Sequence, residues 1–496
     1  MTEETYWYSA LAPEAVAEAR IIVDAFRDRG IEIGGFPDGA EEDDDVESDG
    51  IAFMYAKGHI LVREQYLGGA GGTLKPQPVQ DAGKQRGVLD ILRENRVEEV
   101  EVRRVVRDIL LLRWNPHRGK GIRRAEPPDV PDLLDLIDAE LGAGIATPDH
   151  VLTASQHWVP CMAREARPVF ATVGPYPPLC RAGGARVRIF LADTGLVEDA
   201  ARTFPWLAGV EGDLDQQTAD DAIPPYRGHG TFVAGVLRAM APDTQIHVEN
   251  IFDTAGSARE SDLVIRLNEA FGFGFEILHL TASCTTRKNI PLLTLETWLE
   301  LLRQYKGVVC VAPAGNNYTR RPSWPGAFPD VLSVGALATD EHHRADFSNY
   351  GGWVDVYAPG EKLINAFGQG TYRYYVPPNE GEATFSGLTE WSGTSFSAPI
   401  VTGLIAARMA RCGESAREAA AALLAKARAQ AIPGVGPVLL PSCDDGDCGH
   451  NRGEHRGCGC HHRCERDCRG GCGGGCGCGG GHGGHGGAHL AGHPRM

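Results

Sequence analysis

Three short segments in a fixed order constrain the fold of this 496-residue chain more than any other feature. Asp193-Thr194-Gly195 ends an apolar run over residues 187–192. Gly228-His229-Gly230-Thr231 begins a helical pattern, and Ser392-Gly393-Thr394-Ser395 leads into another helical pattern, with Pro399 expected in its first turn. Each reactive side chain is therefore expected where a rigid strand or helix meets a tight turn.

The pattern between residues 186 and 429 predicts an α/β domain. Short apolar runs, such as residues 277–280 and 308–312, alternate with helical stretches. Strands that alternate with helices are joined by crossovers into a parallel sheet that has helices on both faces. Ligands of such folds bind at the carboxyl ends of the strands, where Asp193 is expected.

The three segments supply an acid, a base and a hydroxyl nucleophile in the chain order Asp193, His229 and Ser395. In this chemistry the carboxylate orients the imidazole, the imidazole takes the hydroxyl proton, and the oxygen attacks a carbonyl carbon. Asn316 follows the strand expected at residues 308–312. We predict that it stabilises the oxyanion together with the Ser395 backbone N–H, which lies at a helix N-terminus.

The motifs together resemble the subtilisin-like serine peptidases, the subtilase family. The residues that carry the resemblance are Ala192-Asp193-Thr194-Gly195, Gly228-His229-Gly230-Thr231-Phe232-Val233-Ala234-Gly235, Ala314-Gly315-Asn316 and Ser392-Gly393-Thr394-Ser395-Phe396-Ser397-Ala398-Pro399. The likeness covers about half of the chain. It implies a subtilisin-like parallel sheet and endopeptidase activity through an acyl-enzyme on Ser395.

The resemblance also implies that substrates bind extended along two strands. The matching residues are Gly256, Ser257, Ala258, Thr281, Ala282 and Ser283, with Ala314 and Gly315 beside the predicted oxyanion donor. Many family members have Ser-Leu-Gly where this chain has Thr281-Ala282-Ser283, so a side chain replaces glycine beside the specificity pocket. The calcium-binding loop of many secreted relatives is missing, and we expect no required cofactor and no metal in this domain.

Residues 1–165 are predicted to form a smaller α+β region that precedes a peptidase domain over residues 166–431. An amphipathic helix ending before Gly30 and an acidic loop at residues 41–45 come first. The order that follows is strand, helix, strand, strand, helix, strand, at residues 51–62, 88–94, 97–106, 109–114, 131–141 and 150–154, which is ferredoxin-like. This order is similar to that of the inhibitory propeptides of many subtilases. Intramolecular inhibition is therefore one hypothesis, and an independent binding domain is the other.

Residues 432–496 are predicted to be a disordered tail rich in glycine, cysteine and histidine. Thiolate and imidazole groups at close spacing are typical ligands of zinc or another soft metal. The candidate ligands are Cys458, Cys460, His461, His462, Cys464, Cys468 and Cys472. No single four-ligand pattern stands out, so a flexible low-complexity tail without metal is the alternative.

Composition narrows the class of partner. The net charge of −17 argues against nucleic acid, since binding phosphates needs clustered Lys and Arg. No apolar run is long enough to span a bilayer, and the N-terminus lacks the pattern of a signal peptide. We therefore expect a cytoplasmic protein that acts on a peptide or protein substrate without a membrane, and we expect Cys161 and Cys180 to be buried or free thiols.

Two functions remain open at this stage. The first is a serine endopeptidase that uses Asp193, His229, Ser395 and Asn316. The second is a catalytically silent protein that binds peptides or sequesters metal on the same scaffold. Labelling by a serine-reactive fluorophosphonate, compared between the wild type and Ser395→Ala, separates the two.

Overall fold

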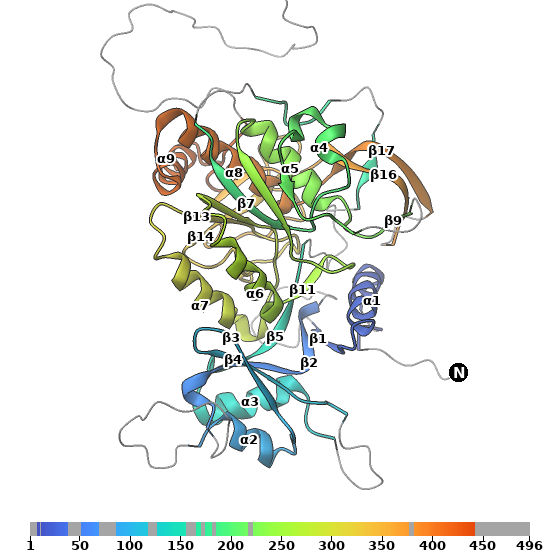
Figure 1. Ribbon diagram of the computed structural model, residues 1–496, viewed down its shortest axis with the longest axis vertical. Coiled ribbons are helices and arrows are strands. Elements are labelled where there is room, and N and C mark those ends of the chain that lie inside the picture. Colours follow the sequence, from blue (N-terminus) through green and yellow to red (C-terminus); the bar gives the residue numbers. More distant parts are fainter. Residues whose placement is uncertain are drawn as a thin grey trace, which may run out of the picture. The chain divides into compact units, whose positions relative to one another are not determined.

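The computed structural model describes the following stretches, all within the unit Met1–Cys448: residues 7–9, 11–37, 51–68, 86–117, 126–154, 165–169, 174–180, 185–216, 222–375 and 381–441 (Figure 1). Residues 458–472, the predicted metal ligands of the tail, lie outside these stretches.

A seven-stranded parallel sheet organises the second half of the described chain. Its strand order is β15-β14-β13-β12-β7-β10-β8. The bounds are β7 (Arg188–Asp193), β8 (Glu211–Gly212), β10 (Gln245–Asn250), β12 (Ile277–Leu280), β13 (Val309–Pro313), β14 (Val331–Leu337) and β15 (Val356–Pro359). The prediction of a parallel α/β sheet is confirmed.

Helices cover both faces of this sheet, and the alternation of side chains along β7 shows why. Ile189 and Leu191 belong to a core with α5, α8 and α9, whereas Phe190 and Ala192 belong to a core with α6 and α7. Figure 1 shows these two groups on opposite sides of the sheet. The helices are α4 (Ala200–Thr203), α5 (His229–Met240), α6 (Glu260–Ala270), α7 (Leu293–Leu302), α8 (Thr394–Cys412) and α9 (Ala416–Ala429).

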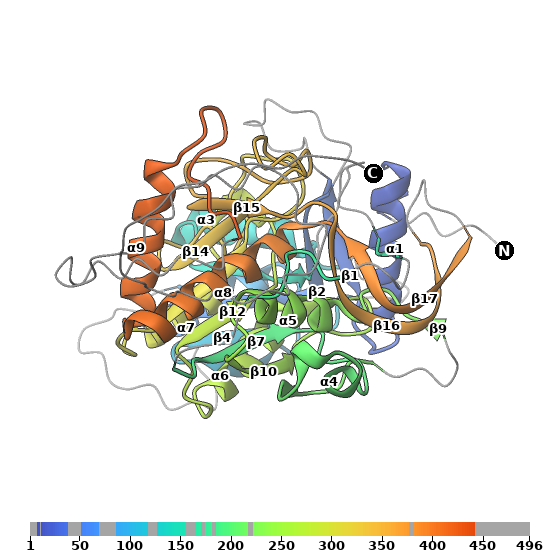
Figure 2. The same cartoon turned by 90° about the horizontal axis from the view of Figure 1, so that it is seen from above.

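A second sheet of the peptidase half is built on a long hairpin. Its order is β6-β17-β16-β9, and the hairpin β16–β17 curves past α5 (Figure 2). The strands are β6 (Arg167–Pro168), β9 (Ala222–Ile223), β16 (Leu363–Arg373) and β17 (Glu382–Trp391).

The N-terminal half of the described chain forms an antiparallel sheet against which three helices pack. Its elements are α1 (Pro13–Arg27), β1 (Ile33–Pro37), β2 (Ile51–Arg63), α2 (Val88–Glu94), β3 (Glu101–Val106), β4 (Ile109–Arg113), α3 (Val130–Leu141) and β5 (Ala146–Thr153). The order β5-β2-β4-β3, with α2 and α3 in the chain between them, confirms the predicted succession of elements. The short β1, which pairs with β2, was not predicted.

The N-terminal sheet continues into the peptidase half. β5 pairs antiparallel with β11 (Ser257–Arg259), which lies about a hundred residues later in the sequence. Leu61, Val106, Ile109 and Leu111 share an apolar core with residues of α6 and α7. The two halves therefore bury apolar surface against each other, beyond the pairing of the two strands.

Three local expectations are corrected. Pro399 lies inside α8, in its second turn, so its missing N–H leaves the Ser395 carbonyl without the usual helical hydrogen bond. Ordered structure continues past residue 432, because Leu439 is buried and donates its N–H to Tyr357 O on β15 at 2.9 Å. Cys180 is disulfide-bonded, as is Cys412, so it is not a free thiol.

Candidate active site

Asp193 and His229 form the centre of the site. His229 Nδ1 lies 2.8 Å from Asp193 Oδ1, and both side chains are fully buried. The Thr194 N–H donates to the same Asp193 oxygen at 2.7 Å. The carboxylate therefore fixes the orientation of the ring and leaves Nε2 as the nitrogen that can accept a proton.

Two glycines let the segments that carry these side chains come together. A Cβ on Gly230 would collide with the carbonyl oxygen of Gly195. Gly195 itself has φ +92°, a conformation that other residues rarely adopt. Side chains at these positions would push α5 away from the end of β7. The glycines in both motifs therefore allow the 2.8 Å contact between His229 Nδ1 and Asp193 Oδ1.

Ser395 stands in the first turn of α8 and is almost fully buried. Its Oγ donates to the carbonyl oxygen of Ala154, a residue of the N-terminal half, at 2.9 Å. Within the described stretches, His229 Nε2 has no hydrogen-bond partner. The hydroxyl is thus engaged by a peptide carbonyl, and rotation toward His229 is the movement needed for proton transfer.

Asn316 lies beside Ser395 and its carboxamide has a fixed orientation. Asn316 Oδ1 accepts from the Thr394 N–H and from Thr394 Oγ1, both at 2.8 Å. The neighbouring Gly315 N–H donates to Thr394 Oγ1 at 3.0 Å, and Ala314 is held by a hydrogen bond to Val334 O on β14. With Oδ1 used as an acceptor, Nδ2 is the end of the carboxamide that donates.

Residues 151–154, which we call the 151–154 segment, lie as a middle strand between two strands of the peptidase half. Val151, Leu152 and Thr153 pair with Arg259, Ala258 and Ser257. On the other side, Thr153 and Ser283 exchange backbone hydrogen bonds of 3.0 and 3.1 Å, and the Ala154 N–H donates to Gly256 O at 2.8 Å. Four of the residues predicted to bind substrate, Gly256, Ser257, Ala258 and Ser283, thus already hold an extended peptide.

Sequence reasoning missed this occupant, although it did predict a strand at residues 150–154. The place of this strand in the chain could have revealed its role, because it is the last strand of the N-terminal region and precedes the peptidase domain. A strand with an exposed edge is also a template for another extended segment, as β11 is here.

Thr281, which directly follows β12, contacts the triad. Its Oγ1 lies 2.5 Å from Asp193 Oδ2 and 2.8 Å from Ala192 O. The predicted substrate residue therefore also supports the catalytic acid, while its neighbour Ala282 is fully buried in the core beneath. A hydroxyl at this position supplies the second carboxylate oxygen with a donor.

Aromatic rings enclose the other face of the histidine. The ring of His229 lies 5.2 Å from that of Phe396 and 5.4 Å from that of Trp391, between ring centroids. Such packing excludes water from the imidazole and strengthens its interaction with Asp193.

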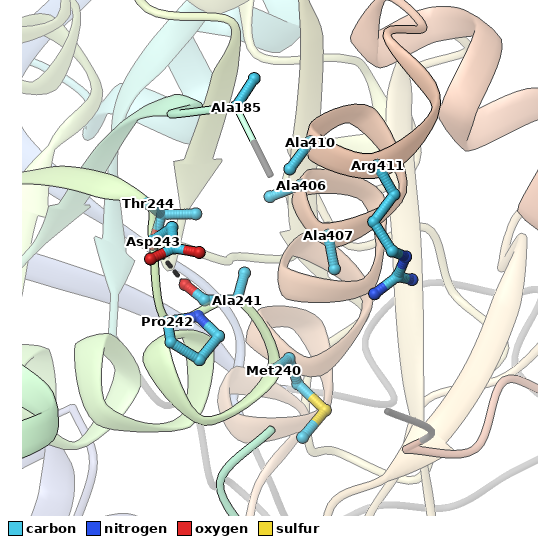
Figure 3. Close-up of a pocket in the computed structure, with 10 residues that line it drawn as sticks. All are labelled: Ala185, Met240, Ala241, Pro242, Asp243, Thr244, Ala406, Ala407, Ala410 and Arg411. Carbon is cyan, nitrogen blue, oxygen red and sulfur yellow. Dashed lines mark hydrogen bonds between the residues drawn. The ribbon is translucent and has the colours of Figure 1, made fainter. Parts of the chain in front are cut away.

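Other candidate sites in the described stretches have fewer reactive side chains. A pocket beside the ends of α5 and α8 is lined mainly by small side chains and contains no triad residue (Figure 3). No group of three or more His, Cys, Asp or Glu side chains is arranged to hold a metal in the part of the chain that the structure describes. The helices described there are too short or too polar to cross a membrane.

Comparisons with known proteins agree with the geometry. A model of the Subtilase family matches residues 184–436. The thermophilic serine proteinase of Bacillus sp. (strain AK1) is 34% identical over 189 residues, 36% of this chain and 41% of that protein. M-protease of Shouchella clausii (strain KSM-K16) is 27% identical over 233 residues, 45% of this chain and 54% of that protein. The chain thus spans about half the length of these curated relatives or less.

Among solved structures, the patellamide maturation protease PatA is 27% identical, with a TM-score of 0.38. The match covers 51% of this chain and 88% of that one.

Proposed function

Because this chain belongs to the subtilase family, we propose that it is a serine endopeptidase in which Ser395, His229 and Asp193 act as nucleophile, base and orienting acid. The observation that carries the proposal is the joint geometry of the site. A buried Asp193–His229 pair packs through the His229 ring against Phe396, the residue after Ser395. The Ser395 hydroxyl contacts the carbonyl of a peptide held in extended form. Acyl transfer to serine uses these parts, once the Ser395 hydroxyl turns from the Ala154 carbonyl to His229 Nε2.

The reaction follows from these positions. Ser395 Oγ attacks the carbonyl carbon while its proton passes to His229 Nε2, and Asp193 stabilises the imidazolium that forms. Asn316 Nδ2 and the Ser395 N–H donate to the oxygen that becomes negative. His229 then gives its proton to the leaving amine, and a water molecule releases the acyl group from Ser395 by the same steps in reverse.

We further propose that the N-terminal region inhibits the site in the same molecule. The 151–154 segment fills the place of a substrate, and it is anchored on both sides by backbone hydrogen bonds. Asp149, fully buried, accepts from the N–H and the hydroxyl of Ser261 at 3.0 and 2.7 Å in the first turn of α6. A substrate must displace this whole interface to reach Ser395.

The bond that follows Ala154 is the one presented to Ser395. Cleavage there would leave residues 1–154 as a separate chain held by the same contacts. Ala154 is fully buried, so a small residue fits the position before the scissile bond in this arrangement. We therefore propose Ala154–Ser155 as the site of self-cleavage.

The alternative is a catalytically silent protein that binds peptides on the same scaffold. The engagement of Ser395 by Ala154 is compatible with it, because a bound strand need not be cut. Labelling with a fluorophosphonate decides between the two. We expect labelling of the wild type that is absent in Ser395→Ala and that rises after the N-terminal region is removed. Equal labelling of both proteins would contradict the endopeptidase, and so would the absence of labelling both in the full chain and after the N-terminal region is removed.

For the tail, zinc or another soft metal held by residues 458–472 stays a proposal based on its thiols and imidazoles. Protein purified without oxygen is expected to carry chelator-sensitive zinc in a fixed ratio to the chain. A ratio near zero would instead favour the alternative, a low-complexity tail that binds no metal.

A further inference from the structure

Asp215 is a buried carboxylate next to the triad that the reaction just described does not use. It follows β8 and is 4% exposed. Its own N–H donates to Leu196 O at 2.7 Å, and the Leu196 N–H donates to Asp213 O at 2.9 Å. The backbone around Asp215 is therefore fixed against the turn that follows Asp193.

The Asp215 carboxylate joins the two segments that carry Asp193 and His229. Its Oδ2 accepts from the Gly228 N–H at 2.6 Å and from Thr194 Oγ1 at 3.1 Å. Its Oδ1 accepts from the Gln216 N–H at 2.7 Å. Thr194 Oγ1 in turn accepts from the Gly230 N–H at 3.0 Å. The Asp215 side chain thus contacts Gly228 and Thr194 directly and is linked to Gly230 through Thr194.

The backbone at Gly228 needs such an acceptor. Gly228 has φ +88° and directly precedes His229 at the start of α5. Its N–H points at a buried oxygen, and a buried donor without an acceptor costs about 1–3 kcal/mol. The Asp215 carboxylate removes this cost and, through Thr194, sets how closely α5 approaches the end of β7.

The surroundings of Asp215 make its charge sensitive to pH. Burial raises its pKa to about 6, three hydrogen bonds from Gly228, Gln216 and Thr194 oppose the rise, and the nearby charge of Asp193 adds to it. Asp193 is the charged group that acts on it from β7, and the donors from the other elements are neutral. A protonated carboxyl would turn one of its acceptor sites into a donor that faces N–H and O–H groups.

We propose that Asp215 is a positioning residue of the triad, which as a carboxylate holds the His229 turn against Asp193 and which releases that turn when protonated. This inference rests on the proposed endopeptidase function. It predicts that activity falls as the pH drops through about 6, because Asp215 gains a proton there.

The first test is the pH dependence of kcat/KM for Asp215→Asn, measured on the activated enzyme. The amide cannot accept from all three donors, so we expect a loss of about 10- to 100-fold near pH 8. Below pH 6, log kcat/KM of Asp215→Asn should fall less steeply with pH than that of the wild type, because one ionisation is gone. A merely structural role would lower activity equally at every pH.

Asp213→Asn is the matched control. Asp213 lies in the same loop, but its Oδ2 accepts from the Asn250 N–H on β10 at 3.0 Å and not from Thr194 or Gly228. We expect its activity within about twofold of the wild type, with an unchanged pH profile. A profile for Asp215→Asn that keeps its slope, or the same change in Asp213→Asn, would overturn the proposal.

A second test does not need activity. In the full chain carrying Ser395→Ala, the proton between His229 Nδ1 and Asp193 should give a far-downfield NMR resonance that broadens and disappears as the pH falls through about 6. It should be weak or absent at pH 8 when Asp215→Asn is added. A resonance unaffected by both changes would overturn the role of Asp215. Absence of Ser395-dependent hydrolysis in the wild type would instead overturn the endopeptidase function. The NMR measurement would still test whether Asp215 positions His229.

Discussion

The reactive side chains could be predicted because motif and chemistry coincide in the sequence. Asp193, His229 and Ser395 lie at a strand end or a helix start, and the structure brings them to one place. Their supports could not be predicted in this way. Asp215 and Thr281 act on the triad from other segments, and only the fold shows that their oxygens reach Thr194 and Asp193.

Asn316 is the residue for which sequence and geometry make the sharpest joint prediction. Asn316→Ala removes the donor expected at the oxyanion and should lower kcat about 10²–10³-fold with little change in KM, a magnitude taken from the corresponding donor in subtilisin. Steady-state kinetics on the activated enzyme measures both constants. Asn317→Ala keeps the neighbouring backbone N–H that donates to Asn349 Oδ1 and should stay within a few fold. Equal effects of the two changes would argue against the oxyanion role.

At the scale of elements, β12 and α8 are joined by a buried histidine. His279 Nδ1 lies 2.8 Å from Thr402 Oγ1, and neither side chain is exposed. Burial lowers the pKa of His279 from 6.5 to about 4. The helix that carries Ser395 is therefore attached to the sheet through a group that stays neutral in the folded chain.

The lowered pKa predicts how stability depends on pH. Between about pH 6.5 and 4 the unfolded chain binds a proton at residue 279 and the folded chain does not, so the folded state loses stability as the pH falls. The loss reaches about 3 kcal/mol at most. Urea unfolding of Ser395→Ala, with and without His279→Gln, measures it. The added change should make the chain relatively more stable at pH 4 than at pH 7, whereas a constant difference would contradict the buried neutral state.

The contact between Asp149 and α6 predicts the strength of inhibition. Asp149→Ala leaves the Ser261 N–H without its acceptor at a helix N-terminus, which costs about 1 kcal/mol or more. The full chain should then react with a fluorophosphonate about tenfold faster. Asp135→Ala is the control, because this exposed residue pairs across the same interface with Lys288 at 2.7 Å and with Arg287, which keeps Asp138 as its second partner at 2.9 Å. An equal rise of the labelling rate in both variants would mean that Asp149 contributes no more to inhibition than Asp135 does.

At the scale of the whole molecule, the succession of elements was predictable and the joining of the two halves was not. Hydrophobic periodicity gave the order of the N-terminal elements and the parallel sheet, because each depends on nearby residues. The pairing of β5 with β11 joins residues about a hundred positions apart, and no local pattern encodes such a partner. The place of the 151–154 segment between β11 and Ser283 therefore could not be predicted from the sequence.

The central claim is that Ser395 is a nucleophile to which the chain presents its own Ala154 carbonyl. Intact-mass analysis of the purified wild type and of Ser395→Ala tests it most directly. We predict that the wild type contains a fragment ending at Ala154 and another beginning at Ser155, and that Ser395→Ala is uncut at this bond. A wild type that stays uncut while Ser395 reacts freely with a fluorophosphonate, or equal cleavage of both proteins after Ala154, would contradict the account.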